Sequence, residues 1–482
     1  MHGGVAMTID EGLTDLGTGG AVAGNPYLEG NFGPVDTEVT AFDLEITGTL
    51  PRQLDGRYLR NGPNPIDADP ARYHWFTGDG MVHGIRLRDG RAEWYRNRWV
   101  RAGRVPAALG EPDPGGPRTE GMDNAPNTNV IGFGGRTFAI VEAGAKPVEM
   151  DDELATISRC DFDGTLPNGY TAHPKLDPVT GELHAAGYFW ARPEIIEYTV
   201  ISRDGRVVRR EDVPVPGSPM VHDMSITEHF AVFYDLPVTF NLDDAMAGAT
   251  FPYAWDPGYG ARIGVLPRGG SGLDGLRWFD VEPCYVFHPL NAYDEVAADG
   301  TRRIVMDVVR HDRIFDGSRL GPDESVPTLW RWTIELGSSA TAGRVTETQL
   351  EDTAMEFPRV DERVVGRRHR YGFAASVSTS TPGAGITFDG ARILCRDDET
   401  GTLRSHDFGA GHAAGEAVFI PSAPDASGLD GHLMTIVYDA TEDRSDLVVL
   451  SAEDLEGDPV ATVHLPQRVP FGFHGNWVPT SE

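Results

Sequence analysis

Residues 470–477 read Pro-Phe-Gly-Phe-His-Gly-Asn-Trp. Glycines let the backbone bend sharply on either side of His474, and the neighbouring aromatic rings would screen its imidazole from bulk water. This setting suits a metal ligand. A histidine in an aromatic cluster is also commonly a packed, hydrogen-bonded core residue, so the other histidines must decide between the two interpretations.

Four of the fifteen histidines share one setting, in which an apolar or small residue precedes the ring and Pro, Gly or Asp follows it. They are His173, His222, His288 and His474. The separations are 49, 66 and 186 residues, which fit one, one and about three blades if a propeller blade takes roughly 45 to 65 residues. The pattern predicts four inner strand ends that meet at a central axis.

The other histidines lack this recurring context. His74 and His83 lie in one loop-to-strand element that looks structural or pocket-lining, and the remaining nine, His311 among them, are interpreted as surface or satisfied core residues.

The chain is built from short runs rich in Val, Ile, Thr and aromatic residues, bounded by turns that draw on 58 glycines and 35 prolines. Residues 85–88 and 92–100 flank Asp-Gly, as do 194–202 and 206–213, so both pairs predict hairpins. Helical periodicity is nearly absent, with short helical turns at most at 151–157 and 243–249. The sequence predicts an all-β propeller, because radial repetition protects strand edges in so long a chain. No clean period fixes the number of blades.

Charge and composition exclude several functions. The net charge of −32 repels nucleic acid and anionic lipid, and neither of the two lysines belongs to a phosphate-binding loop. Three separated cysteines form no CxxC pair, so we expect neither a disulfide framework nor a zinc knuckle. No motif indicates an obligate protein partner. Residues 1–24 are predicted to be a disordered tail and 25–482 a single domain, located in the cytoplasm because no signal peptide or long apolar run is seen.

Four imidazoles make an all-nitrogen site, which suits Fe, Cu, Zn or Ni better than Mg or Ca. Ligating imidazoles usually donate their other N–H to an acceptor, often a carboxylate. Glu142, Glu356 and Glu416 occur in apolar settings and are candidates for that role. The alternative is that these glutamates lie at strand ends in water or pair with arginines.

Eight motifs resemble the carotenoid cleavage oxygenases, closest to actinobacterial carotenoid- and apocarotenoid-cleaving members, over residues 25 to 477. They are YLRNGPNP (58–65), WFTGDGMVHG (75–84), AHPKLDPVTGEL (172–183), VHDMSITEHFAVFYDLP (221–237), FHPLNAYDE (287–295), EFPRV (356–360), GEAVFIP (415–421) and VPFGFHGNW (469–477). The metal histidines of that family lie inside these motifs.

The resemblance implies a seven-bladed β-propeller with a metal site on its axis and a loop-rich cap over a substrate tunnel. It implies a mononuclear non-haem Fe(II) held by four histidines without a carboxylate ligand. His173, His222, His288 and His474 occupy those four positions. Three outer glutamates should hydrogen-bond three of the imidazoles, and Glu142, Glu356 and Glu416 occupy the matching motifs.

The implied activity is a dioxygenase that cleaves a C=C bond of a carotenoid or apocarotenoid with O2 and gives two carbonyl products, aldehydes or ketones. Because the alkene supplies the four electrons that O2 takes up, no reducing cofactor is expected. The apolar polyene needs an aromatic tunnel. Candidate liners are Phe76, Tyr188, Phe189, Tyr285 and Phe373.

Other functions stay open at this point. One branch of the family cleaves phenolic stilbenes of the lignostilbene type and is expected to hold the phenol with a tyrosine and a lysine. The sequence places Trp99 and Arg136 there, which favours carotenoid cleavage. A propeller lactonase or hydrolase with a Ca²⁺ site, or a non-catalytic binding platform, would leave the histidines and glutamates unexplained.

The aromatic residues of 241–260 suggest weak peripheral contact with a membrane. The sequence does not indicate which double bond is cut, the length of the substrate or the oligomeric state.

Overall fold

The computed structural model describes residues 24–119, 122–317, 320–337, 343–379, 386–388 and 390–480. Of the predicted N-terminal tail, residues 1–23 lie outside the described residues, and Gly24 is exposed. The assignment of 25–482 to a single domain stays a prediction.

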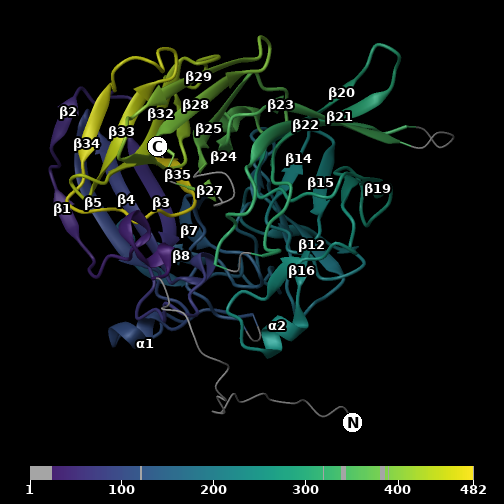
Figure 1. The fold of residues 1–482 in the computed structure, drawn as a ribbon, viewed down its shortest axis with the longest axis horizontal. Helices are drawn as coiled ribbons and strands as arrows, with labels where there is room; N and C mark the ends of the chain where they lie inside the picture. Colours follow the sequence, from purple (N-terminus) through teal and green to yellow (C-terminus); the bar gives the residue numbers. More distant parts are fainter. Residues whose placement is uncertain are drawn as a thin grey trace.

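Seven larger antiparallel sheets form the blades of a β-propeller, as the resemblance implies (Figure 1). The sheet that contains both early and late strands is β1 (Thr40–Phe42), β5 (Arg91–Trp99), β4 (Gly80–Arg88), β3 (Gly56–Pro63) and β35 (Gly475–Pro479). The next is β6 (Asn129–Phe133), β7 (Arg136–Ile140), β8 (Val148–Met150) and β9 (Thr156–Arg159). It is followed by β10 (Lys175–Leu176), β11 (Leu183–Gly187), β12 (Ile195–Ile201) and β13 (Val207–Pro214).

The remaining four blades continue in chain order. The fourth blade is β14 (Met224–Ile226), β15 (Phe230–Asp235), β18 (Arg262–Pro267) and β19 (Arg277–Asp280). The fifth is β20 (Pro289–Val296), β21 (Arg302–Arg310), β22 (Thr328–Glu335) and β23 (Arg344–Glu351). The sixth is β24 (Met355–Arg359), β25 (Tyr371–Ser376), β28 (Arg392–Asp397) and β29 (Thr402–Asp407). The last holds β2 (Ile46–Gly48), β34 (Ala461–His464), β33 (Arg444–Ser451), β32 (Gly431–Asp439), β30 (His412–Ala414) and β31 (Val418–Pro421).

Short elements lie outside the blades. Two small hairpins pair β16 (Val238–Phe240) with β17 (Tyr253–Trp255), and β26 (Ser378–Thr379) with β27 (Ile386–Thr387). The helices of the described residues are α1 (Val105–Leu109), α2 (Leu242–Met246) and the 3-10 turns Pro26–Leu28, Gly30–Phe32, Trp75–Thr77 and Glu362–Val364.

Pairing between early and late strands closes the ring. β35 lies beside β3, with Gly475 opposite Arg60, and β2 pairs with β34 (Figure 1). The first and last blades therefore each contain strands from both ends of the described chain, and neither blade has an unpaired junction that could open easily.

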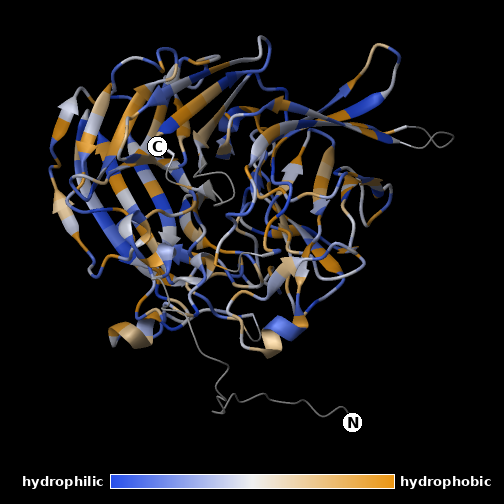
Figure 2. Ribbon diagram, in the orientation of Figure 1, coloured by the Kyte–Doolittle hydropathy of each residue, from blue (hydrophilic) through white to orange (hydrophobic). Residues whose placement is uncertain are grey.

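The local patterns explain the strands. Outer strands such as β13 and β23 alternate exposed and half-buried residues, whereas β3 is buried along its whole length, and alternating colours along the outer strands are visible in Figure 2. The two predicted hairpins are confirmed as β4–β5 and β12–β13. A short helix at 243–249 is confirmed in part by α2.

No helix forms at 151–157, where the sequence allowed a short helical turn at most. The Asp151 carboxylate accepts from the backbone N–H groups of Glu153 and Ala155. This side-chain hydrogen bonding stabilises a turn in place of a helix, and β9 begins at Thr156.

Each of the four histidines precedes the innermost strand of a blade. His173 lies two residues before β10, His222 two before β14, His288 directly before β20 and His474 directly before β35. Each of these strands ends its sheet on the inner side, where β10 contacts β14 and β14 contacts β20. The shared sequence setting therefore reflects a shared position at the axis.

Close backbone contact beside His474 requires glycine. A Cβ on Gly472 would lie 2.7 Å from the carbonyl oxygen of Asn61 and 3.0 Å from Cα of Gly62. We expect Gly472→Ala to lower the free energy of unfolding by about 1–3 kcal/mol, as overpacking does. Urea unfolding measures the change. Gly269→Ala, where a Cβ meets nothing within 4 Å, is the control, and equal stability of both variants would contradict the close contact.

Candidate metal centre

The structure brings His173, His222, His288 and His474 together. One ring nitrogen of each lies within 4.8 Å of the others, and all four residues are buried. Nε2 of His222 and Nε2 of His288 are 3.2 Å apart, and Nε2 of His173 has no hydrogen-bond partner among the described residues. Buried nitrogen atoms that converge without partners are costly unless an ion binds between them. The donor set therefore fits a divalent transition metal.

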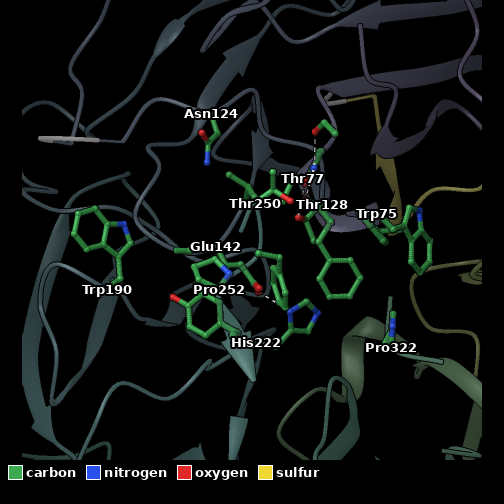
Figure 3. Close-up of a pocket in the computed structure, with 18 of the residues that line it drawn as sticks. Trp75, Thr77, Asn124, Thr128, Glu142, Trp190, His222, Thr250, Pro252 and Pro322 are labelled. Atoms are coloured by element: carbon green, nitrogen blue, oxygen red, sulfur yellow. Dashed lines mark hydrogen bonds and ion pairs between the residues drawn. The ribbon is translucent and has the colours of Figure 1, made fainter. Parts of the chain in front are cut away.

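Three glutamates contact the outer nitrogens of three of these rings. Nδ1 of His288 donates to Oε2 of Glu356 at 2.6 Å, and Nδ1 of His474 donates to Oε1 of Glu416 at 3.0 Å. Oε2 of Glu142 lies 2.5 Å from Nδ1 of His222 (Figure 3). Because each Nδ1 faces a carboxylate, each Nε2 is left with its lone pair toward the centre.

His173 has a different environment. Its nearest carboxylate oxygen, Oδ2 of Asp223, is 3.8 Å from its Nδ1, beyond hydrogen-bond distance. Nζ of Lys175 donates to that same oxygen at 2.8 Å. The ion pair between Lys175 and Asp223 thus leaves His173 without a carboxylate of its own.

Each glutamate also has a further partner, and the three partners differ chemically. The Tyr188 hydroxyl donates to Oε1 of Glu142 at 3.0 Å, and Nε2 of His311 lies 3.0 Å from Oε1 of Glu356. A guanidinium nitrogen of Arg359 lies 3.1 Å from Oε2 of Glu416. Both oxygens of all three carboxylates therefore face donors, which stabilises the ionised form.

Burial and neighbouring charges shift the pKa values of the buried glutamates and histidines in different directions. Burial would raise the pKa of Glu356, but His288 holds it well below its ordinary value; Arg359 and His474 do the same for Glu416. Burial lowers the pKa of His474 to about 3. Burial also lowers the pKa of His288, yet Glu356 outweighs this effect and raises it.

His173 has a pKa well below its ordinary value, because it is buried and because the other three histidines lie beside it. The site therefore does not hold four protonated rings.

Local backbone features aim the glutamates. Phe357, directly after Glu356, has a φ of 54°, and the register between β24 and β25 shifts between Glu356 and Arg359. A bulge of this kind turns one side chain away from the strand direction. Before Glu416, a Cβ on Gly415 would lie 2.3 Å from a guanidinium nitrogen of Arg60, so glycine allows the approach.

A cavity of about 850 Å³ reaches His222, His288 and His474. Trp190 lies on one side of it and Trp75 on the other, with Glu142 and His222 between them (Figure 3). The other aromatic liners include Phe76, Phe251, Tyr253, Phe287, Phe357 and Phe473. Much of the lining comes from loops between strands, such as residues 122–128 and 249–252, and these form the predicted cap.

Of the five candidate liners from the sequence, Phe76 and Tyr188 line the cavity. Phe189, Tyr285 and Phe373 do not line it. Tyr285 is buried in the core and donates to the Met220 carbonyl, and Phe373 stacks on Phe419.

The positions assigned to a phenol-binding pair are also wrong. Arg136 pairs with Glu149, and the Trp99 indole N–H donates to the Asn64 carbonyl; neither residue lines the cavity. Within the described residues, no lysine lines it.

His311 is the residue that sequence reasoning missed. Of the two predicted settings, surface or satisfied core, the second is confirmed, because His311 is fully buried and hydrogen-bonds Glu356. Its connection to the metal centre through Glu356 was not predicted. It follows the buried run at the end of β21. That position marks it as an inward-facing polar residue, although no motif pointed to its partner.

We predict that Glu416→Gln lowers the affinity for a divalent metal 10- to 100-fold, because loss of an outer carboxylate weakens the orientation and basicity of the ligand. Chelator competition measures the dissociation constant. Glu362→Gln, which changes the half-exposed partner of Arg359, should leave it within about threefold. Equal affinity of the Glu416 variant and the unmodified protein would contradict this role.

Comparison with known proteins agrees with this geometry. The family model described as retinal pigment epithelial membrane protein matches residues 32–479. A carotenoid cleavage oxygenase from Mycobacterium tuberculosis is 48% identical over 500 residues, covering 95% of this chain and 98% of the relative. A carotenoid 9,10(9',10')-cleavage dioxygenase from Phaseolus vulgaris is 32% identical, covering 94% and 89%. The solved lignostilbene dioxygenase of Pseudomonas brassicacearum has a TM-score of 0.83 and 30% identity, covering 94% and 98%. The chain therefore belongs to the family of the retinal pigment epithelial membrane protein and the carotenoid cleavage oxygenases.

Proposed function

We propose that the protein is a non-haem Fe(II) dioxygenase that cleaves one C=C bond of a carotenoid or apocarotenoid with O2 and releases two carbonyl products. The observation that carries the proposal is the apolar cavity that reaches three of the four convergent imidazoles. The relative from Mycobacterium tuberculosis, described as a carotenoid cleavage oxygenase, supports the same reaction class.

His173, His222, His288 and His474 would hold the iron through their inner nitrogens. When bound, Fe(II) supplies the centre at which O2 reacts. Conversion of one C=C bond into two C=O bonds uses both oxygen atoms of O2 and takes four electrons from the alkene, so the reaction balances without a reductant. Glu142, Glu356 and Glu416 keep the outer ring protons in place and supply negative charge beside the ion.

The chain's other contribution is to position the substrate. Phe76, Phe251 and Phe287 give the cavity flat apolar walls on which a rigid polyene can lie. Thr128 also lines the cavity, and its hydroxyl donates to Oδ1 of Asn127. Fixing one double bond beside the ion lowers the entropic cost of the reaction.

The size and chemistry of the cavity favour a long apolar substrate. Its volume of about 850 Å³ lies near the upper end of the roughly 300–1,000 Å³ range of small-molecule sites. A hydroxystilbene is the second candidate, because the lignostilbene dioxygenase shares the fold and because Tyr188 and Tyr253 line this cavity. A Ca²⁺-dependent hydrolase is disfavoured, because Ca²⁺ needs oxygen ligands and the converging atoms are nitrogens.

Protein purified without O2 should contain about one iron per chain and should cleave an apocarotenal under O2 to shorter carbonyl products. His222→Ala should lose both iron and cleavage, whereas His229→Ala, at a half-exposed side chain, should keep both. Metal analysis and mass spectrometry of the products measure these results. Native protein that holds calcium or no metal, and cleaves nothing after addition of Fe(II), would refute the proposal; cleavage of hydroxystilbenes alone would select the second candidate.

We also propose weak peripheral contact with membrane lipid, within the cytoplasm, at the apolar residues around the cavity mouth. Leu242 and Met246 are 64% and 70% exposed, Trp190 is 44% exposed, and all three line the cavity. They would let an apolar substrate pass from lipid into the cavity. Figure 2 shows α2 as part hydrophilic, because Asp243 and Asp244 separate the two apolar residues. Within the described residues, no helix is long and apolar enough to span a membrane.

In flotation with phosphatidylcholine liposomes, a small fraction of the protein should float, because transfer of two apolar side chains from water into lipid is favourable. The double variant Leu242→Gln, Met246→Gln should reduce that fraction about tenfold or more. Val179→Gln, at a side chain that is 72% exposed and does not line the cavity, should not change it. No flotation of the unmodified protein would argue against membrane contact.

A further inference from the structure

His311 lies behind the metal centre without being close enough to bind the ion. It is fully buried, and its Nε2 is 3.0 Å from Oε1 of Glu356. The other carboxylate oxygen, Oε2, accepts from Nδ1 of His288 and from the backbone N–H of Phe357, both at 2.6 Å. Oε2 of Glu356 thus bonds His288 and Phe357, and His311 is the donor to the other oxygen, Oε1.

The surroundings of His311 define its tautomer. Nδ1 is buried and has no hydrogen-bond partner among the described residues. A proton on Nδ1 would therefore be an unsatisfied buried donor, which costs more than an unused lone pair. The geometry therefore places a proton on Nε2, where Glu356 accepts it.

Backbone pairing fixes this donor in relation to His288. The N–H and C=O groups of His311 and Tyr285 bond each other, both at 2.8 Å, and Tyr285 lies three residues before His288. The Phe287 ring packs edge-on against the His311 ring, with centroids 5.3 Å apart. His311 and His288 therefore belong to one blade, and Glu356, on β24 of the next blade, is held between them.

We propose that His311 is a positioning residue for the metal centre. Its Nε2–H holds the Glu356 carboxylate in the rotamer that presents Oε2 to His288, and so fixes the ring plane of that ligand. The proposal rests on the metal site of the proposed function but not on the substrate. Loss of the donor would leave one oxygen of a buried carboxylate without a partner and free the carboxylate to turn.

Substitution of His311 by glutamine or asparagine distinguishes loss of the Nε2–H donor from loss of ring volume. The amide N–H of Gln can reach the place of histidine Nε2, whereas the shorter Asn side chain cannot. Co(II) is the probe, added to metal-free protein, with affinity from chelator competition and geometry from the visible absorption bands. His311→Leu and His311→Asn should weaken Co(II) binding about tenfold, the lower end of outer-partner effects, and shift the bands. His311→Gln should stay within about threefold and keep the native spectrum.

His83→Gln is the matched control. His83 is also buried, and it hydrogen-bonds Tyr95 and none of the three glutamates. It should leave affinity and spectrum unchanged. If the leucine variant does not fold, the comparison of asparagine with glutamine still decides.

Three results would overturn the proposal. Native affinity in the asparagine variant would show that the donor does not matter, and equal weakening in the asparagine and glutamine variants would show that only ring volume matters. A native protein that takes up no Co(II) would remove the metal site itself. By contrast, normal Co(II) binding with no polyene cleavage would refute the proposed reaction and leave the role of His311 intact.

Discussion

The pairing of β35 with β3 is the contact on which the metal centre depends. β35 begins at Gly475, opposite Arg60, and the residue before it is His474. The backbone N–H of Gly475 also donates to Oε2 of Glu416. The hydrogen bonds that close the propeller thus place the fourth imidazole and one of its carboxylates at the same time. The ring and the centre are held by the same short segment.

The three outer carboxylates receive unequal compensation. Glu142 has a phenol behind it, Glu356 an imidazole and Glu416 a guanidinium, while His173 has no carboxylate within hydrogen-bond distance. Because charge is weakly screened in a buried site, these differences reach the ion. Four imidazoles of one chemical type are therefore made electrostatically distinct by residues outside the cluster.

Sequence reasoning reached the parts of the site that local pattern determines. The four histidines share a setting because each precedes the innermost strand of a blade, and each setting is contained in one short motif. The hairpins β4–β5 and β12–β13 were also predictable, because an Asp-Gly turn is a local signal in the sequence.

The direction of a side chain, and its contacts with residues of another blade, could not be predicted from local sequence patterns. Tyr285 and Phe373 face the core and Phe76 faces the cavity, although all three lie in similar apolar surroundings in the sequence. His311 and Glu356 are 45 residues apart in the sequence and belong to two adjacent blades. Trp99 and Arg136 were predicted at phenol-binding positions but do not line the cavity, because matching of sequence positions does not give the direction of a side chain.

The closure of the ring also sets an order of assembly. His173, His222 and His288 belong to blades that are complete within consecutive stretches of chain, whereas His474 comes next to a strand made after all other strands and paired with one of the first. A nascent chain that has formed six blades would present three ligands and an open seam. A metal ion could contact all four imidazoles only after the first blade is completed, which makes the centre a product of the finished fold and not a nucleus for it.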